Sequence, residues 1–266
     1  MTRDRWCTVA HLGNGPTVPH AVAAMPQVRP LASSDLGWVV GLAAARRERL
    51  AGYAPRFWRP APDARERHAP FLAGQIDDPG TVTVRTDRGY LLGAPQGDRL
   101  VADDMVLEDD SAWGSDGVAL LLAAGRHADL RAVCPVPERA RRETVEALGL
   151  TRVESWWTRD LPTSESSRSD GGRLAVESDG GRLTVDGGAG RLVTAPPVYA
   201  PGGPVLLVTE VTGLAPLLAL EQAARQVGAV VSVVAVPAGD ATGRDLLEDA
   251  GYRATTDYHE GRPRGA

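Results

Sequence analysis

Three acidic residues lie close together near the middle of the chain, where their spacing could serve proton transfer. Asp103, Asp104 and Glu108 fall in residues 99–108, a segment that we expect to form a strand. Side chains of a strand alternate between its faces, so Asp104 and Glu108 share one face and Asp103 takes the other. A carboxylate beside an ammonium group can accept its proton as a general base. Carboxylates that are simply solvated or hydrogen-bonded are the alternative.

A histidine and an aromatic segment precede these carboxylates. His68 lies in a predicted helix, residues 62–76, where it could relay protons or lie on the surface without a role. Tyr53, Phe57 and Trp58 belong to an aromatic, proline-rich stretch just before that helix. Such side chains can wall a pocket that selects an apolar or aromatic amine, or they can pack in the core.

Part of the set of elements that must position these residues is predicted to occur twice. Two apolar strand segments, residues 132–137 and 232–237, each follow a helical run and precede a charged amphipathic stretch. Each stretch stops at a glycine, Gly149 in one case and Gly251 in the other. Recurrence at a spacing of about a hundred residues indicates a duplicated unit of helix, buried strand, helix and strand.

The chain divides into five regions by composition and pattern. Glycine-rich and serine-rich residues with almost no apolar content mark a linker at 162–172. Short alternating strands follow it, at 173–177, 182–185 and 191–194, before the second copy opens at 204–210. We therefore expect a flexible N-terminal arm at 1–27, a first domain at 28–161, the linker, a partial second domain at 173–260 and a disordered tail at 261–266. Met25 is a possible alternative start.

Residues 28–161 read in order as strand, two helices, three antiparallel strands, helix, strand, helix and strand. This order resembles the GNAT superfamily of N-acetyltransferases, a mixed α/β (α+β) fold whose central sheet is splayed open to admit acetyl-CoA. The segment 100–107 running into residues 117–121, and 147–150 before a Trp-rich strand, carry the resemblance. Residues 204–258 are similar to the second half of another such fold.

The resemblance implies a role for several residues. The backbone of Met105, Val106 and Leu107 would hold the pantetheine arm of acetyl-CoA. Small residues would expose N–H groups to the pyrophosphate at a helix N-terminus, a role that would fall to three glycines: Gly114, Gly117 and Gly213. The base would be Asp104 or Glu108, and the aromatic segment at residues 53–58 would wall the acceptor pocket. The tyrosine that many members use as general acid is replaced by Val145 and Leu247.

Two functions follow from the resemblance. One is acetyl-CoA-dependent transfer of an acetyl group to the amine of a small molecule or peptide, by direct attack in a ternary complex. The other is a catalytically degenerate tandem protein that binds a ligand or another protein. Both pyrophosphate loops depart from the family pattern and carry acidic residues such as Asp116 and Glu210, which favours the second function.

Composition excludes several other classes of protein. The formal net charge of −5 offers no basic surface for a nucleic acid. No apolar run reaches 18 residues, so we expect no membrane span and a cytoplasmic protein. Cys7 and Cys134 are the only cysteines, too few for a disulfide framework or a cysteine metal site, and we expect no metal. The acceptor amine and the oligomeric state stay open.

Overall fold

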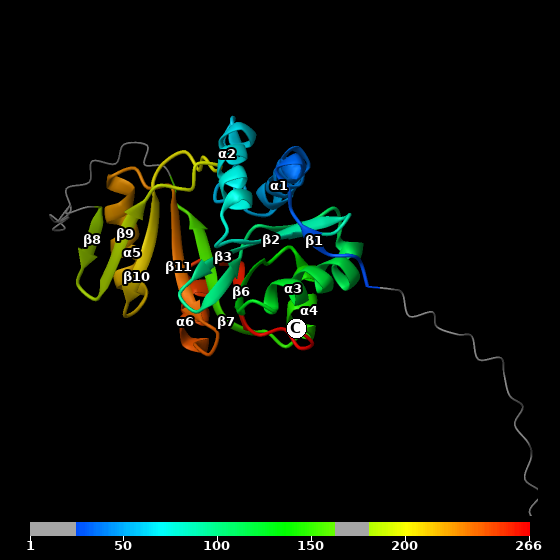
Figure 1. Cartoon of the computed structure of the whole chain (residues 1–266). Coiled ribbons are helices and arrows are strands. Elements are labelled where there is room, and N and C mark those ends of the chain that lie inside the picture. The colour runs from blue at the N-terminus through cyan, green and yellow to red at the C-terminus, as the bar shows by residue number, and fades with distance from the viewer. Residues whose placement is uncertain (1–24, 163–180) are drawn as a thin grey trace, which may run out of the picture.

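The computed structural model describes residues 25–162 and 181–266 (Figure 1). Most of the expected N-terminal arm, nearly all of the expected linker and the expected strand at 173–177 lie outside the described residues.

The first half of the structure follows the predicted order of elements. Its strands and helices are β1 (Arg29–Pro30), α1 (Leu36–Tyr53), α2 (Ala64–Asp77), β2 (Val82–Arg85), β3 (Gly89–Gln96), β4 (Arg99–Ala102), β5 (Met105–Leu107), α3 (Val118–Gly125), β6 (Asp129–Pro135), α4 (Arg139–Ala147) and β7 (Thr151–Asp160). The expected strand 99–108 is interrupted at Asp103 and Asp104, where β4 ends and β5 begins. On either side of the interruption the pairing differs: β4 pairs with both β3 and β6, whereas β5 pairs with β3 alone among the described strands.

The second half repeats the later part of the first. Its elements are β8 (Arg182–Val185), β9 (Gly188–Val193), β10 (Val205–Val211), α5 (Leu214–Gln226), β11 (Val231–Pro237), α6 (Ala241–Asp249) and β12 (Arg253–Gly261). Pro135 and Pro237 end equivalent strands, and Gly149 and Gly251 follow equivalent helices with φ of 89° and 78°, in the left-handed region that glycine tolerates. Equivalent residues are thus 102 apart. The sequence alignment of 132–137 with 232–237 was therefore displaced by two residues.

The two halves exchange their last strands. The sheet order β1-β2-β3-β4-β6-β12-β7-β11-β10-β9-β8 places β12 between two strands of the first half and β7 between two elements of the second. Strand β12 is antiparallel to β6, with Thr256 opposite Pro135, and β7 is antiparallel to β11, with Asp160 opposite Val231. The division of the chain into two domains stays a prediction. In the structure, the strands that this division assigns to the two domains are interleaved within one sheet.

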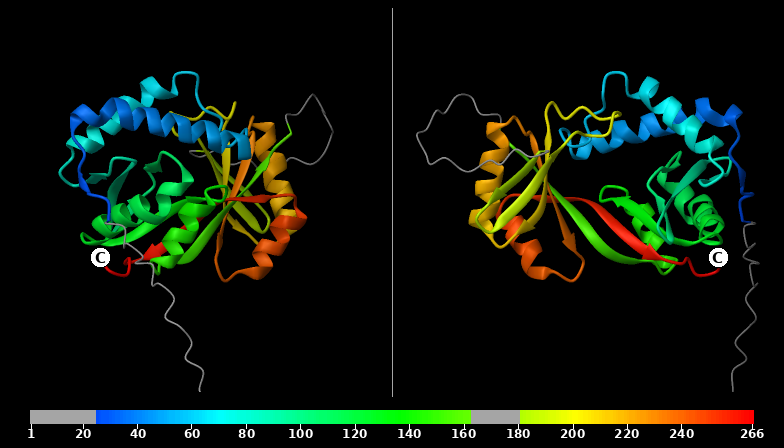
Figure 2. Two further views of the ribbon diagram at one scale, coloured as in Figure 1. Left: turned by 90° about the vertical axis from the view of Figure 1, so that its right-hand side faces the viewer. Right: turned by 60° about the vertical axis from the view of Figure 1, so that its left-hand side comes forward.

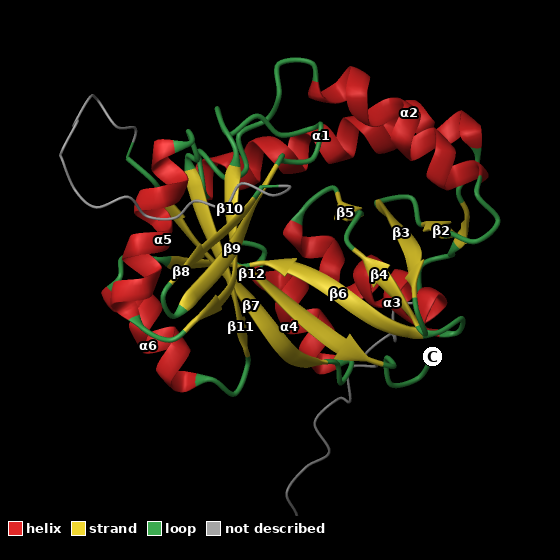
Figure 3. Ribbon diagram, turned by 90° about the vertical axis from the view of Figure 1, so that its left-hand side faces the viewer, coloured by secondary structure: helices red, strands yellow, loops and turns green. Residues whose placement is uncertain are grey.

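Helices cover this sheet in separate groups (Figures 2 and 3). Helices α1 and α2 lie together across one side of the first half, over a core that includes Val39, Leu72 and Tyr90. Helices α3 and α4 pack on a second core of that half, which contains Leu120 and Val145. Helices α5 and α6 cover the second half over a third core. Among the described helices none is long and apolar enough to cross a membrane.

The C-terminal tail differs from its expected disorder. Pro263 is buried, and the backbone N–H of Arg264 donates to the carbonyl of Leu148 at 2.8 Å. The tail also passes close to Gly125, where an added Cβ would lie 2.6 Å from the Pro263 ring. The composition of residues 261–266 suggested a free end, but a backbone hydrogen bond and a close approach to glycine dock it on the first half.

Candidate functional site

Parallel strands part in the same way in both halves. Strands β4 and β6 pair over four residues and separate after Ala102 and Ala132. Strands β10 and β11 also pair over four residues and separate after Val208 and Val234. Each half therefore has the splayed opening that the sequence predicted for the first.

Arg141 fills the opening of the first half. It comes from α4 and is fully buried. Its Nη1 atom donates to the carbonyl of Met105 and its Nη2 atom to that of Ala102, both at 3.0 Å, so it joins the end of β4 to the start of β5. Trp113 lies beside it, with the guanidinium 5.5 Å from the ring centroid. Because Arg141 donates to the carbonyl of Met105, that carbonyl is already engaged, and the contacts of Met105, Val106 and Leu107 with a pantetheine arm stay a prediction.

A buried charge cluster fixes Arg141. Glu138 accepts from Arg141 Nη1 at 3.1 Å and forms a two-pronged pair with Arg46, at 2.7 Å to Nε and 3.1 Å to Nη2. Burial alone would raise the pKa of Glu138, but the charges of the two arginines and their hydrogen bonds hold it below its ordinary value. We call these residues the Arg46–Glu138–Arg141 cluster. It ties α1 to α4 through the opening of the sheet.

A cleft of about 290 Å³ lies at the opening of the second half, and we call it the second-half cleft. The residue equivalent to Arg141 is Gly243, which lines this cleft. Its other lining residues come from the ends of β10 and β11, from the turn that leads into α5 and from α6 with the residue before it: Val208, Thr209, Glu210, Val211, Thr212, Gly213, Val234, Ala235, Val236, Asp240, Thr242, Leu246 and Leu247.

The second-half cleft fits acetyl-CoA only in part. The first backbone N–H groups of α5, just after Gly213, have no partner within the helix and could meet a phosphate. The charged residues that line the cleft are Glu210 and Asp240, and both are acidic. A pyrophosphate would therefore meet like charges there, and none of the described lining residues is an arginine that could offset them.

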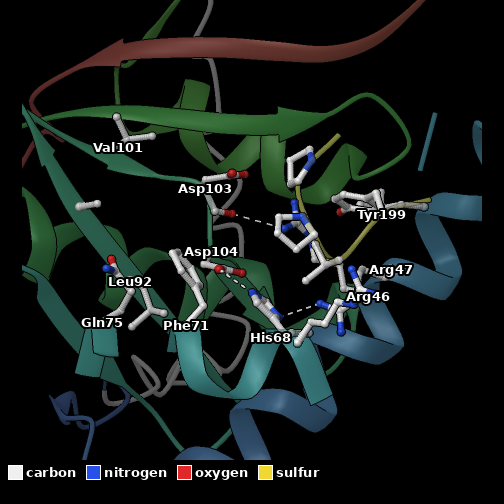
Figure 4. A pocket seen from close by; sticks show the side chains of 17 residues that line it. Arg46, Arg47, His68, Phe71, Gln75, Leu92, Val101, Asp103, Asp104 and Tyr199 are labelled. Carbon is white, nitrogen blue, oxygen red and sulfur yellow. Dashed lines mark hydrogen bonds and ion pairs between the residues drawn. The ribbon is translucent and has the colours of Figure 1, made fainter. Parts of the chain in front are cut away.

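The larger of the two cavities has a volume of about 410 Å³ and lies in the first half, against helices α1 and α2 (Figure 4). We call it the first-half cavity. Helices α1 and α2 and strands β3 and β4 form three of its walls, and residues 196–199 of the second half form the fourth. Most of its lining is apolar, but charged residues from α1, α2 and the end of β4 also reach it: Arg46, Arg47, Arg67, His68, Asp103 and Asp104.

A chain of contacts runs across this cavity from Arg47 through His68 to Asp104. Arg47 Nη1 lies 2.7 Å from His68 Nδ1, and His68 Nε2 lies 3.3 Å from Asp104 Oδ2. A guanidinium can only donate, so Nδ1 accepts and Nε2 carries the ring proton toward Asp104. Burial would raise the pKa of Asp104, but the hydrogen bond from His68 and the charges of Arg46 and Arg47 hold it below its ordinary value. Asp104 is therefore a weak base in this state.

Asp103 has the opposite character. Its side chain is exposed to water on the side of the cavity, but protein atoms surround it on the other sides. The resulting partial loss of hydration, together with the negative charge of Asp104, raises the pKa of Asp103. The structure gives it no ion pair with another described residue. Its backbone carbonyl accepts from Arg46 at 3.3 Å, which fixes the position of the residue. Of the three acidic residues singled out from the sequence, Asp103 is the one best suited to receive a proton or a cation.

The other predicted site residues lie elsewhere. Glu108 is exposed beside Arg88, outside both cavities, because the interruption at residues 103–104 breaks the alternation that would place it with Asp104. Tyr53, Phe57 and Trp58 pack with one another and with Tyr199, and none of the three lines the first-half cavity. Their role as an acceptor wall stays a prediction.

The predicted glycines are divided between the halves. Gly213 lines the second-half cleft. Gly114 and Gly117 lie in the turn before α3 and line neither cavity. A Cβ at Gly117 would lie 2.7 Å from the ring of Trp113, so this glycine is explained by the packing of that ring. Their binding of a cofactor stays a prediction.

Sequence reasoning missed the arginines and Tyr199. Arg46 and Arg47 follow Val39 and Ala43 at helical spacing, so the period of α1 already placed them on its buried face. Nothing local could have indicated Tyr199, which reaches the cavity from the second half. Among the described residues, no group of three or more His, Cys, Asp or Glu side chains could hold a metal ion.

Comparisons with known proteins agree on the fold. Neither protein-family models nor curated proteins match the sequence. Among solved structures, a GCN5-related N-acetyltransferase from Sphaerobacter thermophilus is 14% identical, covers 88% of this chain and 94% of that chain, and gives a TM-score of 0.52. A structure described as an acetyltransferase from Thermoplasma acidophilum is 11% identical, covers 89% and 99%, and gives 0.54. At these identities the likeness shows the fold alone, and the chain has the GNAT acetyltransferase fold that its sequence predicted.

Proposed function

We propose that the protein binds a small organic amine in the first-half cavity, with Asp103 as the counter-ion of the ammonium group. The observation that carries the proposal is a water-accessible carboxylate on the wall of a largely apolar cavity, with no ion pair to another described residue. An ammonium group that meets such a carboxylate gains a charge-assisted hydrogen bond in a partly desolvated setting.

The surrounding charges support an amine at Asp103. Arg46, whose guanidinium donates to the backbone carbonyl of Asp103, is already neutralised by Glu138. The carboxylate of Asp104 is already in contact with the imidazole ring of His68. Apolar side chains such as Leu50, Leu92 and Val101 would receive the hydrocarbon part of the ligand.

The second half completes this cavity. The N–H of Ala61 donates to the carbonyl of Val198, and the N–H of Ala200 donates to that of Arg59, so the segment that carries Tyr199 is fixed to the α1–α2 connection. Burial raises the pKa of Tyr199 to about 12, so its hydroxyl stays protonated and can donate to a ligand. The second half thus supplies a wall that the first half alone would lack.

Isothermal titration of the full chain with a panel of primary amines tests the proposal. We expect Asp103→Asn to abolish binding and Asp98→Asn, an exposed carboxylate on the turn before β4, to leave it unchanged. Absence of binding for every amine of the panel, at millimolar ligand, would remove the proposed function.

The second-half cleft supports a second candidate, acetyl-CoA-dependent N-acetyl transfer by direct attack of the amine in a ternary complex. The cleft is open where the first half is filled, because Gly243 stands where Arg141 would project. Backbone groups near Gly213 would hold the phosphates, and Glu210 is the carboxylate beside them that could accept a proton.

Thermal unfolding with acetyl-CoA and with free CoA tests this second candidate. A ligand that binds the native state must raise the melting temperature. We expect Ala235→Trp, which fills the cleft from an exposed position, to abolish the shift, and Ala147→Trp, an exposed position on α4, to preserve it. No shift in the wild type at millimolar ligand rules the candidate out. If a shift is seen, release of CoA across the amine panel shows whether transfer occurs.

A further inference from the structure

Arg47 is a buried arginine on the wall of the first-half cavity that the protein leaves partly unsatisfied. It is 4% exposed. Its Nη1 atom contacts His68, whereas its Nη2 atom is buried and has no hydrogen-bond partner among the described residues. The neighbouring buried arginines differ in having a carboxylate partner, because Arg46 and Arg141 share Glu138, although Nε of Arg141 is also buried without a hydrogen-bond partner among the described residues.

A buried guanidinium without a carboxylate is costly, and an anionic ligand would satisfy it. Arginine offers five N–H donors in a planar fork that matches a carboxylate. Leaving a buried donor unpaired forfeits its hydration without replacement. Arg47 therefore favours a ligand that brings a carboxylate into the cavity.

Arg47 and Asp103 line the same cavity, so one ligand could contact both. Only the imidazole ring of His68 separates Arg47 from Asp104, with contacts of 2.7 Å and 3.3 Å at its two nitrogens. Asp103 is the next residue along the chain and faces the same cavity (Figure 4). The cavity thus presents one cation and one anion, neither in an ion pair with another described residue.

Apolar side chains line the space around these two groups. Phe71 stands on the wall, 55% exposed, and stacks on His68 with ring centroids 5.8 Å apart. An apolar ligand group would cover a ring that otherwise faces water. Leu50, Val101 and Pro196 line the cavity too.

We propose that the ligand of the first-half cavity is an amino-acid-like zwitterion with an apolar side chain, whose carboxylate binds Arg47 and whose ammonium group binds Asp103. This inference rests on the proposed amine binding and adds the carboxylate and the apolar group. It assigns Arg47 a binding role that is separate from the acetyl chemistry of the fold.

Matched ligands separate the contributions of the two charges. Isothermal titration of the full chain compares phenylalanine with phenethylamine and 3-phenylpropionate, and leucine with 3-methylbutan-1-amine and 4-methylpentanoate. In at least one of the two series we expect the amino acid to bind about tenfold or more tightly than its amine and than its carboxylic acid. This difference is what one additional charge-assisted pair of hydrogen bonds contributes.

Variants of Arg47 locate the carboxylate. Arg47→Gln is expected to lower the affinity for the amino acid to that for the amine and to leave the affinity for the amine unchanged. Arg47→Lys, which keeps the charge, should restore part of the preference. Arg49→Gln, an exposed arginine on the same helix, is the matched control and should change nothing. If Arg47→Gln does not fold by circular dichroism, the comparison of ligands on the wild type still decides.

The outcomes distinguish this inference from the function on which it rests. If amines bind but no amino acid binds more tightly than its amine, the zwitterion is refuted and amine binding stands. Failure of every amine and every amino acid refutes both. Binding of the carboxylic acids alone, as tightly as the amino acids, also refutes both, because Asp103 would then contribute nothing.

Discussion

A single pair of equivalent residues decides how the two halves differ at their openings. Arg141 and Gly243 are both the third residue of a helix that follows the separating strands. The arginine fills the first opening and bonds the carbonyls of Ala102 and Met105, whereas the glycine leaves the second open. At the same scale, Asp103 faces the first-half cavity with a raised pKa while Asp104 is held by His68. The chemistry of each half therefore depends on individual side chains placed on a shared framework.

The raised pKa of Asp103 predicts a stability effect whose sign depends on pH. A raised pKa means that the native state holds the proton more tightly than the unfolded chain, so the ionised carboxylate destabilises the fold above that pKa. Below its ordinary value of 3.8 the aspartate is protonated in both states and the penalty disappears. We expect Asp103→Asn to raise the melting temperature at pH 7 to 8, with a gain that shrinks toward pH 3.5. Thermal melts across that range, with Asp98→Asn as control, measure it, and a lower melting temperature at pH 7 would contradict it.

The Arg46–Glu138–Arg141 cluster acts between elements. It joins α1 and α4 through the parted strands, and its members are held by hydrogen bonds of 2.7 to 3.1 Å. Helix α1 also contacts the second half, where Tyr53 Oη donates to the carbonyl of Ala254. These polar contacts add to the apolar packing of Val39 and Leu50 in holding α1 above the sheet, and hence in shaping the first-half cavity.

Removal of Glu138 tests this dependence. Glu138→Gln leaves two buried guanidinium groups without their shared carboxylate, so we expect the free energy of unfolding at pH 7 to fall by about 3–5 kcal/mol. Because the folded-state pKa of Glu138 is lowered, its contribution is complete above its ordinary value of 4.5 and is lost as the pH falls through the folded-state value. The difference between variant and wild type should therefore narrow in acid. Urea unfolding at several pH values measures this.

A neighbouring ion pair on the same helix supplies the control. Arg139 and Glu143 form an exposed pair at 2.6 Å, with side chains 79% and 55% exposed. Glu143→Gln is expected to cost less than about 0.5 kcal/mol. An equal effect of the two substitutions would show that the buried cluster has no special role in stability.

The exchange of β7 and β12 joins the two halves in one sheet. Trp157 of β7 packs in the core of the second half with Leu206 and Leu220. Within the interface strands, Ser155 Oγ donates to Asp257 Oδ1 at 2.6 Å, and Asp257 is buried. Neither half has a complete sheet without a strand from the other, so we expect the two halves to unfold together.

A substitution in the second half should therefore weaken the first. Leu220→Ala removes a fully buried side chain of α5, at a cost of about 2–5 kcal/mol. If the halves unfold together, hydrogen exchange in peptides from β3 should accelerate as much as in peptides from β10. Leu218→Ala, on the exposed side of the same helix, is the control and should change neither. Exchange that accelerates only in the second half would mean that the halves unfold separately.

The sequence by itself determined the order of the elements, the repeat and the glycine that follows each equivalent helix. These depend on local periodicity and on turn residues, and nearby residues encode both. It also identified Asp103, Asp104 and His68 as polar residues that could take part in a site. Because it predicts one uninterrupted strand, however, it places Asp104 and Glu108 on the same face. Only the tertiary structure decided that β4 and β5 are separate strands, that Arg141 fills one opening, that residues 196–199 close the cavity and that β7 and β12 are exchanged. Each of these depends on strand register or on a contact between residues far apart in the chain, and no local pattern specifies either.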